Sequence, residues 1–214
     1  MPAEPQFSAP NITTRLRMAY DAGAAERDHA GEDRWRAPLR DQLVALLAAE
    51  RRTRVLEIGA GSGYTSQYFA DQGLDVVATD LSPTQVELCM AKGLTAYVRD
   101  FYNLGFPRRS FDAVWAMNCL LHVPSDDLES VLVGIRDVLA HDGVFCMGTW
   151  GGISREGIYE NDSYRPRRLF ALRADDDVRE RVGKIFEVEE FITLEPSARV
   201  NDRLHVQFVR ARRR

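Results

Sequence analysis

The stretch "RVLEIGAGSGYTSQYFADQGLDVVATD", from Arg54 to Asp80, decides the fold of this chain. It contains two short apolar runs of strand length, separated by a glycine-rich turn and an amphipathic segment with helical spacing. A strand, a turn, a helix and a second strand in this order form a βαβ unit, in which both strands run parallel in one sheet. We therefore expect a parallel α/β core that begins at Arg54.

The rest of the chain continues this alternation. Further strands are predicted for "AYVRD", "FDAVWAM" and "VFCMGTW", and helices for 12–28, 35–50, 65–72, 83–92, 126–140 and 167–183, with an irregular stretch over 151–165. The last two apolar runs, "FEVEEFITLE" and "RLHVQFVRAR", are close enough in sequence to pair as an antiparallel hairpin. The expected fold is α/β, with a seven-stranded, mostly parallel sheet whose last strand is antiparallel.

Composition limits the classes of protein that fit. The chain has 214 residues, 45% of them hydrophobic, and a net charge of −4, which suits one domain and gives no positive field for nucleic acid or an anionic membrane. The three cysteines form no CxxC pattern, so neither disulfides nor zinc are indicated. There is no apolar run of roughly 20 residues and no secretory pattern at the start, which favours a cytoplasmic protein without membrane contact.

The predicted domain plan follows from the same patterns. Residues 1–10 contain three prolines and are expected to form a mobile segment, followed by a single domain over 11–214. Within it we expect N-terminal helices over 11–50 that act as a lid, a ligand-binding core over 53–150 and a substrate-side insert over 151–170.

The glycine-rich turn predicts a ligand. Gly59, Gly61 and Gly63 allow the backbone to turn tightly beside a helix N-terminus, where unpaired N–H groups can meet a ligand. A dinucleotide fingerprint requires a glycine where this chain has Tyr64, which argues against a NAD(P)-linked oxidoreductase. Asp80 ends the second strand, where a carboxylate can accept both hydroxyls of a ribose.

Three acids are expected on one edge of the sheet. Glu57, Asp80 and Asp100 each fall where a predicted parallel strand ends. Open α/β sheets bind their ligands at this carboxyl edge. The three carboxylates and the glycine turn therefore predict one shared ligand site.

These segments resemble the class I S-adenosylmethionine-dependent methyltransferases of small-molecule type, through "VLEIGAGSG", "VVATDLS", "RDF", "FDAVWAMNCLLHVP" and "DGVFCMGTWGG". The resemblance covers roughly residue 20 to the end. It implies a three-layer, Rossmann-like fold and S-adenosyl-L-methionine as cofactor, with S-adenosyl-L-homocysteine as product and no metal. In that family the acid before the first glycine holds the ammonium of the methionine part, which would be Glu57.

The resemblance also assigns the remaining cofactor contacts. The acid of the second strand, Asp80, would hold the ribose, Asp100 and the Phe101 amide would meet the adenine edge, and Leu81 would lie on the adenine face. The predicted cofactor-binding residues are Glu57, Gly59, Ala60, Gly61, Gly63, Asp80, Leu81, Asp100, Phe101 and Asn118.

Two residues are candidates for catalysis. Methyl transfer from a sulfonium depends mainly on holding the nucleophile in line, but a hydroxyl, phenol or ammonium acceptor must also lose a proton. His122, with an ordinary pKa near 6.5, could take this proton, or it could cap the helix that follows. Tyr20 lies in "AYDAGAAERD", which resembles a leading-helix motif that folds over the cofactor, although a packing role also fits.

The acceptor is expected to be a small molecule. The segment after the fourth strand, "MNCLLHVP", lacks the D/N-P-P-Y/F/W pattern of amino-methylating DNA enzymes, and no basic stripe indicates RNA. Arginines of the insert, including Arg168, could clamp an acidic acceptor or pair with nearby acids. The predicted substrate-side residues are Cys119, Trp150, Tyr159, Tyr164 and Arg168.

The sequence thus predicts an enzyme, a monomer or homodimer, that methylates an O or N atom of a small molecule in the biosynthesis of a specialised metabolite. Alternatives that remain are an RNA or protein methyltransferase and a cofactor-binding subunit without turnover, because binding and catalysis would use the same three acids.

Overall fold

The computed structural model describes residues 9–30, 33, 35–195 and 204–214. The helices within these residues are α1 (Ala9–Ala22), α2 (Ala24–Ala30), α3 (Arg36–Ala49), α4 (Tyr64–Asp71), α5 (Pro83–Ala91), α6 (Leu128–Val138), α7 (Asp175–Ile185) and the short 3-10 helix η1 (Leu120–His122). The strands are β1 (Arg54–Ile58), β2 (Asp75–Asp80), β3 (Thr95–Val98), β4 (Phe111–Met117), β5 (Leu139–Gly151), β6 (Arg155–Ile158), β7 (Leu169–Leu172), β8 (Phe186–Leu194) and β9 (His205–Arg213).

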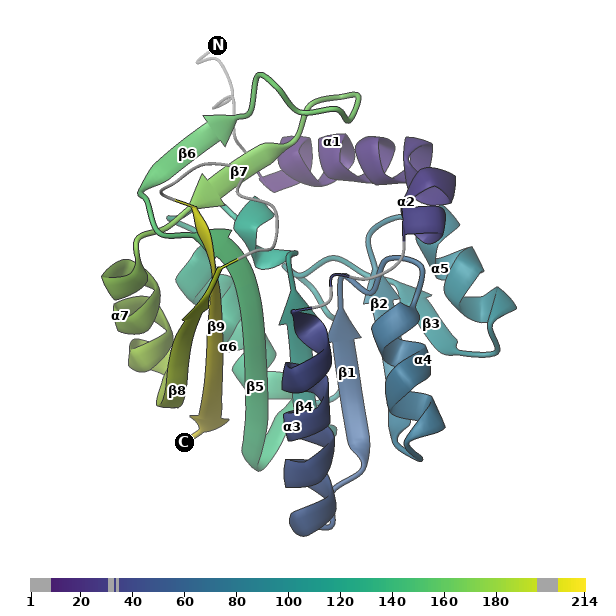
Figure 1. The fold of residues 1–214 in the computed structure, drawn as a ribbon, viewed down its shortest axis with the longest axis vertical. Helices are drawn as coiled ribbons and strands as arrows, with labels where there is room; N and C mark the ends of the chain where they lie inside the picture. Colours follow the sequence, from purple (N-terminus) through teal and green to yellow (C-terminus); the bar gives the residue numbers. More distant parts are fainter. Residues whose placement is uncertain (1–8, 31–32, 34, 196–203) are drawn as a thin grey trace.

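The main sheet has seven strands in the order β3-β2-β1-β4-β5-β9-β8 (Figure 1). The strands from β3 to β5 pair in parallel, whereas β9 pairs antiparallel with both of its neighbours, β5 and β8. Only β9 therefore runs against the rest of this sheet. The predicted fold class is confirmed, including the reversed last strand.

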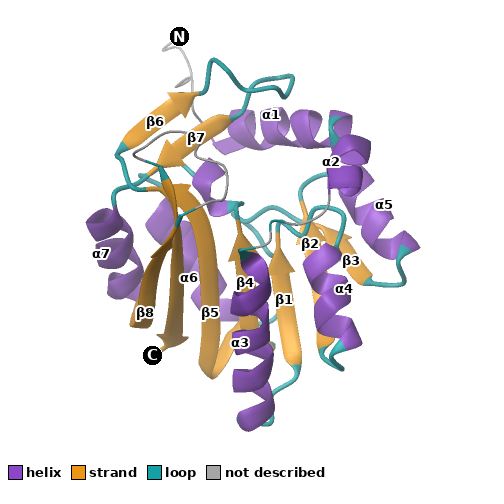
Figure 2. Ribbon diagram, viewed as in Figure 1, coloured by secondary structure: helices purple, strands orange, loops and turns teal. Residues whose placement is uncertain are grey.

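Helices cover both faces of the sheet and form its two cores (Figure 2). Leu39, Leu43 and Leu47 of α3 pack with Phe69 of α4 and with Trp115 of β4 on one face. On the other face, buried side chains of α6 and α7 pack against β1, β4 and β5. The central strands are buried on both faces, which is why their sequences are apolar almost without interruption.

Helix α1 lies across the carboxyl ends of the parallel strands, above the arrowheads of β1 and β4 (Figure 1). Of the predicted mobile segment, residues 1–8 lie outside the described residues, and residues 9–10 begin α1. In the part of the chain that the structure describes, no helix combines the length and the apolar character needed to span a membrane.

The prediction of one helix over 12–28 is wrong, because the helix ends at Ala22 and α2 begins at Ala24. Gly23 stands at the break. A Cβ atom on Gly23 would lie 2.6 Å from Cε1 of Tyr164, which is closer than two carbon atoms can approach. The glycine thus lets an aromatic ring from the insert pack directly on the turn between the two helices.

The insert was also predicted incorrectly. Part of the stretch expected to be irregular forms β6, and the first part of the helix expected over 167–183 is the strand β7, which pairs antiparallel with β6 in a separate two-stranded sheet. Leu169 and Ala171 are buried while Phe170 and Leu172 are partly exposed, so the burial alternates with a period of two. A four-residue apolar run does not distinguish a strand from a helix, and α7 begins only at Asp175.

The turn between β1 and α4 is built on glycines with left-handed backbone angles. Gly59 has φ +70°, and a Cβ atom there would lie 2.5 Å from Cβ of Cys119, the residue that follows β4 by two positions. Gly63, at φ +85°, is equally enclosed, since its Cβ would lie 2.8 Å from Leu94 and 2.9 Å from Cys89. Close packing therefore requires glycine at both ends of this turn.

The variant Gly59→Ala should lower the free energy of unfolding by about 2–4 kcal/mol, because it combines left-handed backbone strain with overpacking against Cys119. Gly73→Ala is the matched control: Gly73 has φ +83°, but nothing lies within 4 Å of its added Cβ, so only strain of about 1–2 kcal/mol is expected. Urea unfolding of both variants measures the difference. Equal losses would show that the contact with Cys119 is not what requires glycine at position 59.

Candidate active site

The glycine turn and the end of β2 are held together by Asp80. Its two carboxylate oxygens accept the N–H groups of Gly61 and Ser82, each at 2.9 Å, and the Ala60 N–H donates to the Thr79 carbonyl oxygen at 2.9 Å. Burial raises the pKa of Asp80 above its usual value, and the N–H groups of Gly61 and Ser82 and the nearby Arg27 guanidinium offset only part of this rise. The carboxylate thus connects the turn to the strand and keeps lone pairs for a ligand.

Glu57 is almost fully buried beneath the turn. The Ser66 hydroxyl of α4 donates to its Oε2 at 2.5 Å, and the Thr79 hydroxyl donates to its backbone oxygen at 2.9 Å. Asp100 follows β3, and its carboxylate accepts the Tyr102 N–H and the hydroxyl of Thr13 in α1, both at 2.9 Å. The three predicted acids therefore lie at the same carboxyl edge, and α1 already contacts one of them.

Asn118 and Cys119 follow β4 directly. Asn118 has a left-handed φ of +54°, its N–H donates to the Gly148 oxygen at 2.7 Å, and its buried Oδ1 has no hydrogen-bond partner among the described residues. The Cys119 thiol donates to the Ile58 oxygen at 3.2 Å, and burial raises the pKa of this thiol to about 12. The thiol therefore stays protonated near neutral pH and is no nucleophile.

Tyr20 and His122 are in direct contact. The Tyr20 hydroxyl lies 2.7 Å from Nε2 of His122, and Nδ1 of His122 lies 2.6 Å from the Leu169 carbonyl oxygen of β7. The Arg168 guanidinium donates to the Tyr20 oxygen at 3.0 Å. Three segments far apart in the sequence, α1, η1 and the insert, thus meet at these side chains.

The ordinary pKa assumed for His122 in the sequence analysis is wrong for this environment. His122 is 3% exposed, and burial lowers its pKa to about 4, with the Arg168 and Arg27 guanidinium groups acting in the same direction. His122 is therefore neutral at pH 7, as expected, but it is a weaker base than a solvated histidine. Its side chain bonds Leu169 and Tyr20, and it does not cap the helix that follows.

One cavity brings most of the predicted residues together. Its lining includes Tyr20, Gly59, Gly61, Asp80, Leu81, Phe101, Asn118, Cys119 and His122. The cavity measures about 50 Å³, whereas sites for nucleoside-sized ligands measure roughly 300–1,000 Å³. Leu16 and Tyr20 of α1 and Arg27 of α2 belong to its lining, so these helices cover the space above the turn.

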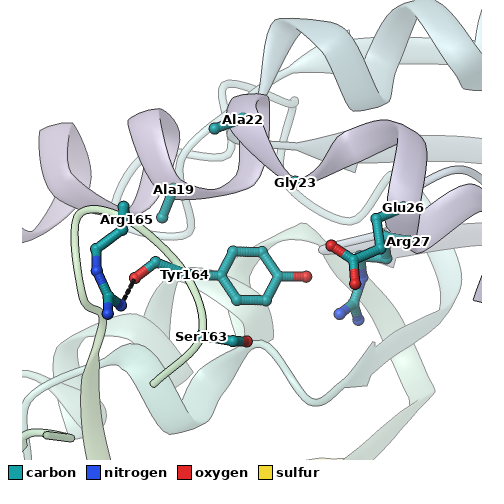
Figure 3. Close-up of a pocket in the computed structure, with 8 residues that line it drawn as sticks. All are labelled: Ala19, Ala22, Gly23, Glu26, Arg27, Ser163, Tyr164 and Arg165. Carbon is teal, nitrogen blue, oxygen red and sulfur yellow. Dashed lines mark hydrogen bonds between the residues drawn. The ribbon is translucent and has the colours of Figure 1, made fainter. Parts of the chain in front are cut away.

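Arg27 of α2 separates this cavity from a larger hollow of about 320 Å³, which is lined by α1, α2 and the insert (Figure 3). In Figure 3 the ring of Tyr164 lies beneath Gly23, and its hydroxyl points toward Arg27 and Glu26. Tyr164 raises the pKa of Arg27 by electrostatic attraction, and the Arg27 guanidinium lies 5.7 Å from the Tyr20 ring centre. Tyr164 therefore connects the insert to the helices over the cavity.

The other predicted substrate-side residues lie in a third hollow of about 240 Å³, where Trp150, Tyr159 and Arg168 contribute to the lining. Arg168 does not face this hollow as a free cation. Its Nε and Nη2 atoms donate to the two carboxylate oxygens of Asp162 at 3.0 and 2.7 Å, and both side chains are largely buried. Of the two readings of Arg168, the structure shows pairing with an acid, not a clamp open to an acidic acceptor.

Sequence reasoning missed two candidates in this region. Gln85 of α5 is 1% exposed, neither its Nε2 nor its Oε1 has a hydrogen-bond partner among the described residues, and its Oε1 lies 4.0 Å from where a Cβ of Gly61 would be. The sequence offered one signal for Gln85: it stands shortly after Asp80, at the start of α5, and so close to the predicted ligand site. Arg27 carried no signal, because only the fold of α2 brings it to Asp80.

Within the described residues no group of three or more His, Cys, Asp or Glu side chains is arranged to hold a metal ion.

Comparisons with known proteins agree with this geometry. Residues 55–143 match a family model described as "Methyltransferase domain". A sterol 24-C-methyltransferase, ERG6B, from Gibberella zeae is 30% identical over 145 residues, which is 64% of this chain and 36% of that protein. A ubiquinone biosynthesis O-methyltransferase from Xanthomonas campestris pv. campestris is 35% identical over 119 residues, 52% of this chain and 49% of that protein. The chain thus spans half or less of these relatives' length.

Among solved structures, the 1,6-didemethyltoxoflavin-N1-methyltransferase of Burkholderia thailandensis, with bound 1,6-didemethyltoxoflavin and S-adenosylhomocysteine, has a TM-score of 0.74 at 22% identity. The likeness covers 98% of this chain and 92% of that one, so the folds agree over nearly their whole length. The match of residues 55–143 to the methyltransferase domain model and the Rossmann-like fold of the described chain both support the resemblance to class I S-adenosylmethionine-dependent methyltransferases that the sequence motifs predicted.

Proposed function

We propose that this protein binds S-adenosyl-L-methionine at the carboxyl edge of its sheet and transfers the methyl group to an O or N atom of a small molecule. One observation carries the proposal: Asp80, the glycine turn and Asn118 line the same cavity as the hydrogen-bonded pair of Tyr20 and His122. Residues suited to bind a nucleoside and a pair suited to transfer a proton thus line one site.

Unpartnered polar atoms in this region suit a cofactor of this size and polarity. Asn118 Oδ1 and the Gln85 amide are buried without hydrogen bonds among the described residues, on either side of the glycine turn. Unpaired buried polar groups cost about 1–3 kcal/mol each, which a ligand with matching groups would remove. When bound, the cofactor would supply an electrophilic methyl group on a sulfonium.

We assign the cofactor contacts to the residues named from the sequence. Asp80 would accept the ribose hydroxyls with its remaining lone pairs, Glu57 would hold the amino acid part from below the turn, and Leu81 and Phe101 would enclose the adenine. Asp100 could accept the adenine amino group only after Thr13 releases it, because the Thr13 hydroxyl now occupies one of its oxygens.

The residues that close the site are therefore proposed to form a lid. Thr13, Tyr20 and Asp21 all connect α1 to the edge of the sheet, since the Ser82 hydroxyl donates to Asp21 at 2.5 Å. Because α1 and α2 cover a cavity of only about 50 Å³, they would move outward to admit a nucleoside and would settle over it again, around a wider cavity, once it is bound. These contacts support a lid formed by α1 and α2, before the proposed binding core over 53–150 and substrate-side insert over 151–170. Helix α3, which the plan of lid helices over 11–50 included, packs its leucines in the core on one face of the sheet and is not part of the lid.

The proposed acceptor is a small organic molecule of specialised metabolism. The printed names of the relatives concern a sterol, ubiquinone biosynthesis and didemethyltoxoflavin, three small-molecule contexts with C-, O- and N-methylation. In this chain the acceptor side would be the hollow under the insert, where Trp150, Tyr159 and Phe170 provide apolar walls. Aromatic walls with a few polar groups are typical of sites for small organic ligands.

The purified protein should bind S-adenosyl-L-homocysteine in isothermal calorimetry. Asp80→Ala should weaken binding by about 1.5–3 kcal/mol, roughly 10- to 150-fold in Kd, because charge-assisted hydrogen bonds to the ribose are lost. Asp75→Ala is the control, since Asp75 begins the same strand and its side chain is 66% exposed. A folded wild-type protein that gives no heat at millimolar ligand would contradict the proposed function, and equal affinities of the two variants would contradict the role of Asp80.

Hydrogen exchange should report the movement of the lid. Amides of α1 and α2 should exchange more slowly when S-adenosyl-L-homocysteine is bound, because the ligand holds the lid closed. The buried helix α6 serves as an internal control, since it lies away from the cavity and should exchange at the same rate in both states. Unchanged exchange in α1 and α2, with the ligand demonstrably bound, would show that these helices are a fixed wall.

A further inference from the structure

The contact between Tyr20 and His122 has a direction that the neighbouring groups fix. A carbonyl oxygen can only accept a hydrogen bond, so the 2.6 Å contact with the Leu169 oxygen requires a proton on Nδ1 of His122. In the neutral ring Nε2 then carries no proton and must accept. The 2.7 Å contact with Tyr20 is therefore donated by the Tyr20 hydroxyl.

The Tyr20 oxygen can therefore only accept hydrogen bonds from its other neighbours. It accepts the Arg168 Nη1–H at 3.0 Å and has one further lone pair. Because its only proton points to His122, Tyr20 cannot donate to a molecule in the cavity that it lines. The group that binds next to Tyr20 must itself bring an O–H or N–H.

Arg168 is held in place for this contact. Asp162 binds it through two oxygens, and its guanidinium carbon lies over the ring of Tyr164, 3.8 Å from the ring centre. The charged groups that face the pair are Arg168 of the insert, Arg27 of α2, Asp162 of the insert and Asp80 of β2. Burial raises the pKa of Tyr20 although the Arg168 and Arg27 guanidinium groups lower it, so Tyr20 is a neutral phenol at rest and keeps the proton that it donates to His122.

Resting on the proposed methyl transfer, we propose that Tyr20 receives the proton of the methyl acceptor and hands its own proton to His122, with Arg168 as the positioning residue. The site would therefore select acceptors that carry an O–H or N–H on the reacting atom and would reject carboxylates. His122 acts through Tyr20 and does not touch the acceptor.

The proton balance of this step is complete. The acceptor O or N forms a bond to the methyl carbon, the carbon–sulfur bond breaks, and its electron pair stays on sulfur. The proton of the acceptor moves to the Tyr20 oxygen while the Tyr20 proton moves to Nε2 of His122. The imidazolium loses this proton to water when the lid opens, which restores the starting state.

The direction of the hydrogen bonds can be tested without any acceptor. In ¹⁵N-histidine-labelled protein loaded with S-adenosyl-L-homocysteine, long-range ¹H–¹⁵N spectra should show His122 as the Nδ1–H form at pH 7 and still neutral at pH 5. The sequence contains four histidines, and the loss of one signal in His122→Gln assigns it. In Tyr20→Phe the Nε2 signal should shift, because its donor is gone. A protonated Nε2 at pH 7, or a charged ring at pH 6, would overturn the proposal.

The catalytic arm uses radiolabelled methyl donor with catechol, aniline and benzoate as probes. Label should enter catechol or aniline but not benzoate, and Tyr20→Phe should lower kcat at least 100-fold while the Kd for S-adenosyl-L-homocysteine changes less than threefold. Tyr97→Phe, which removes an exposed hydroxyl of β3, is the matched control. Labelled benzoate, an unchanged kcat in Tyr20→Phe or a large loss of affinity would overturn the proposal.

The two experiments distinguish a failure of the proposed function from a failure of the proton relay. If the wild-type protein does not bind S-adenosyl-L-homocysteine at all, the proposed function fails first. If it binds but His122 has the opposite tautomer, methyl transfer stands and the relay is wrong. If no probe accepts label, the spectra alone decide on the relay.

Discussion

The hydrogen bond between Tyr20 and His122 links the separate parts of the candidate site. It joins the first helix of the chain to the turn after the central strand β4, 102 positions apart. His122 can make this contact because its other ring nitrogen is fixed to the backbone of β7. A single buried ring therefore determines where α1, η1 and the insert lie relative to the glycine turn.

The turn that carries His122 is itself held by a buried cation. Arg173, 4% exposed, donates to the carbonyl oxygens of Leu120 and Val123, on either side of His122, and to that of Ala171 in β7. Burial lowers the pKa of Arg173 to about 10, so the guanidinium remains charged at neutral pH. Charged donors make stronger hydrogen bonds than neutral ones, so Arg173 adds a polar connection between η1 and β7 to the packing of their buried apolar side chains.

The sequence could predict the sheet because its signals are local. Each βαβ unit is contained in about 30 residues, and the acids that end β1, β2 and β3 reach one edge of a parallel sheet by topology alone. The insert could not be predicted in this way. The run from Leu169 to Leu172 has no period long enough to exclude a helix, and its pairing with β6 depends on contacts that form only in three dimensions.

The site residues also differ in whether local sequence signals could predict them. Glu57, Asp80 and Asp100 could be named from where they stand in their strands, whereas Arg27, Gln85 and Asp162 owe their positions to packing. The basicity of His122 also depends on packing, since its ordinary pKa near 6.5 applies to a solvated ring and this one is enclosed. The residue type indicated that His122 can accept a proton, but its burial determines how strong a base it is.

Under the proposed function, closure of the lid and assembly of the proton relay would be one event. Tyr20 lies on α1, the helix that also supplies Thr13 to Asp100 and Asp21 to Ser82. Any movement of α1 that admits a nucleoside would break the contact between Tyr20 and His122 at the same time. The relay would then form only after α1 has closed again over the bound cofactor, so that under the proposed function proton transfer is confined to the filled and water-excluded site.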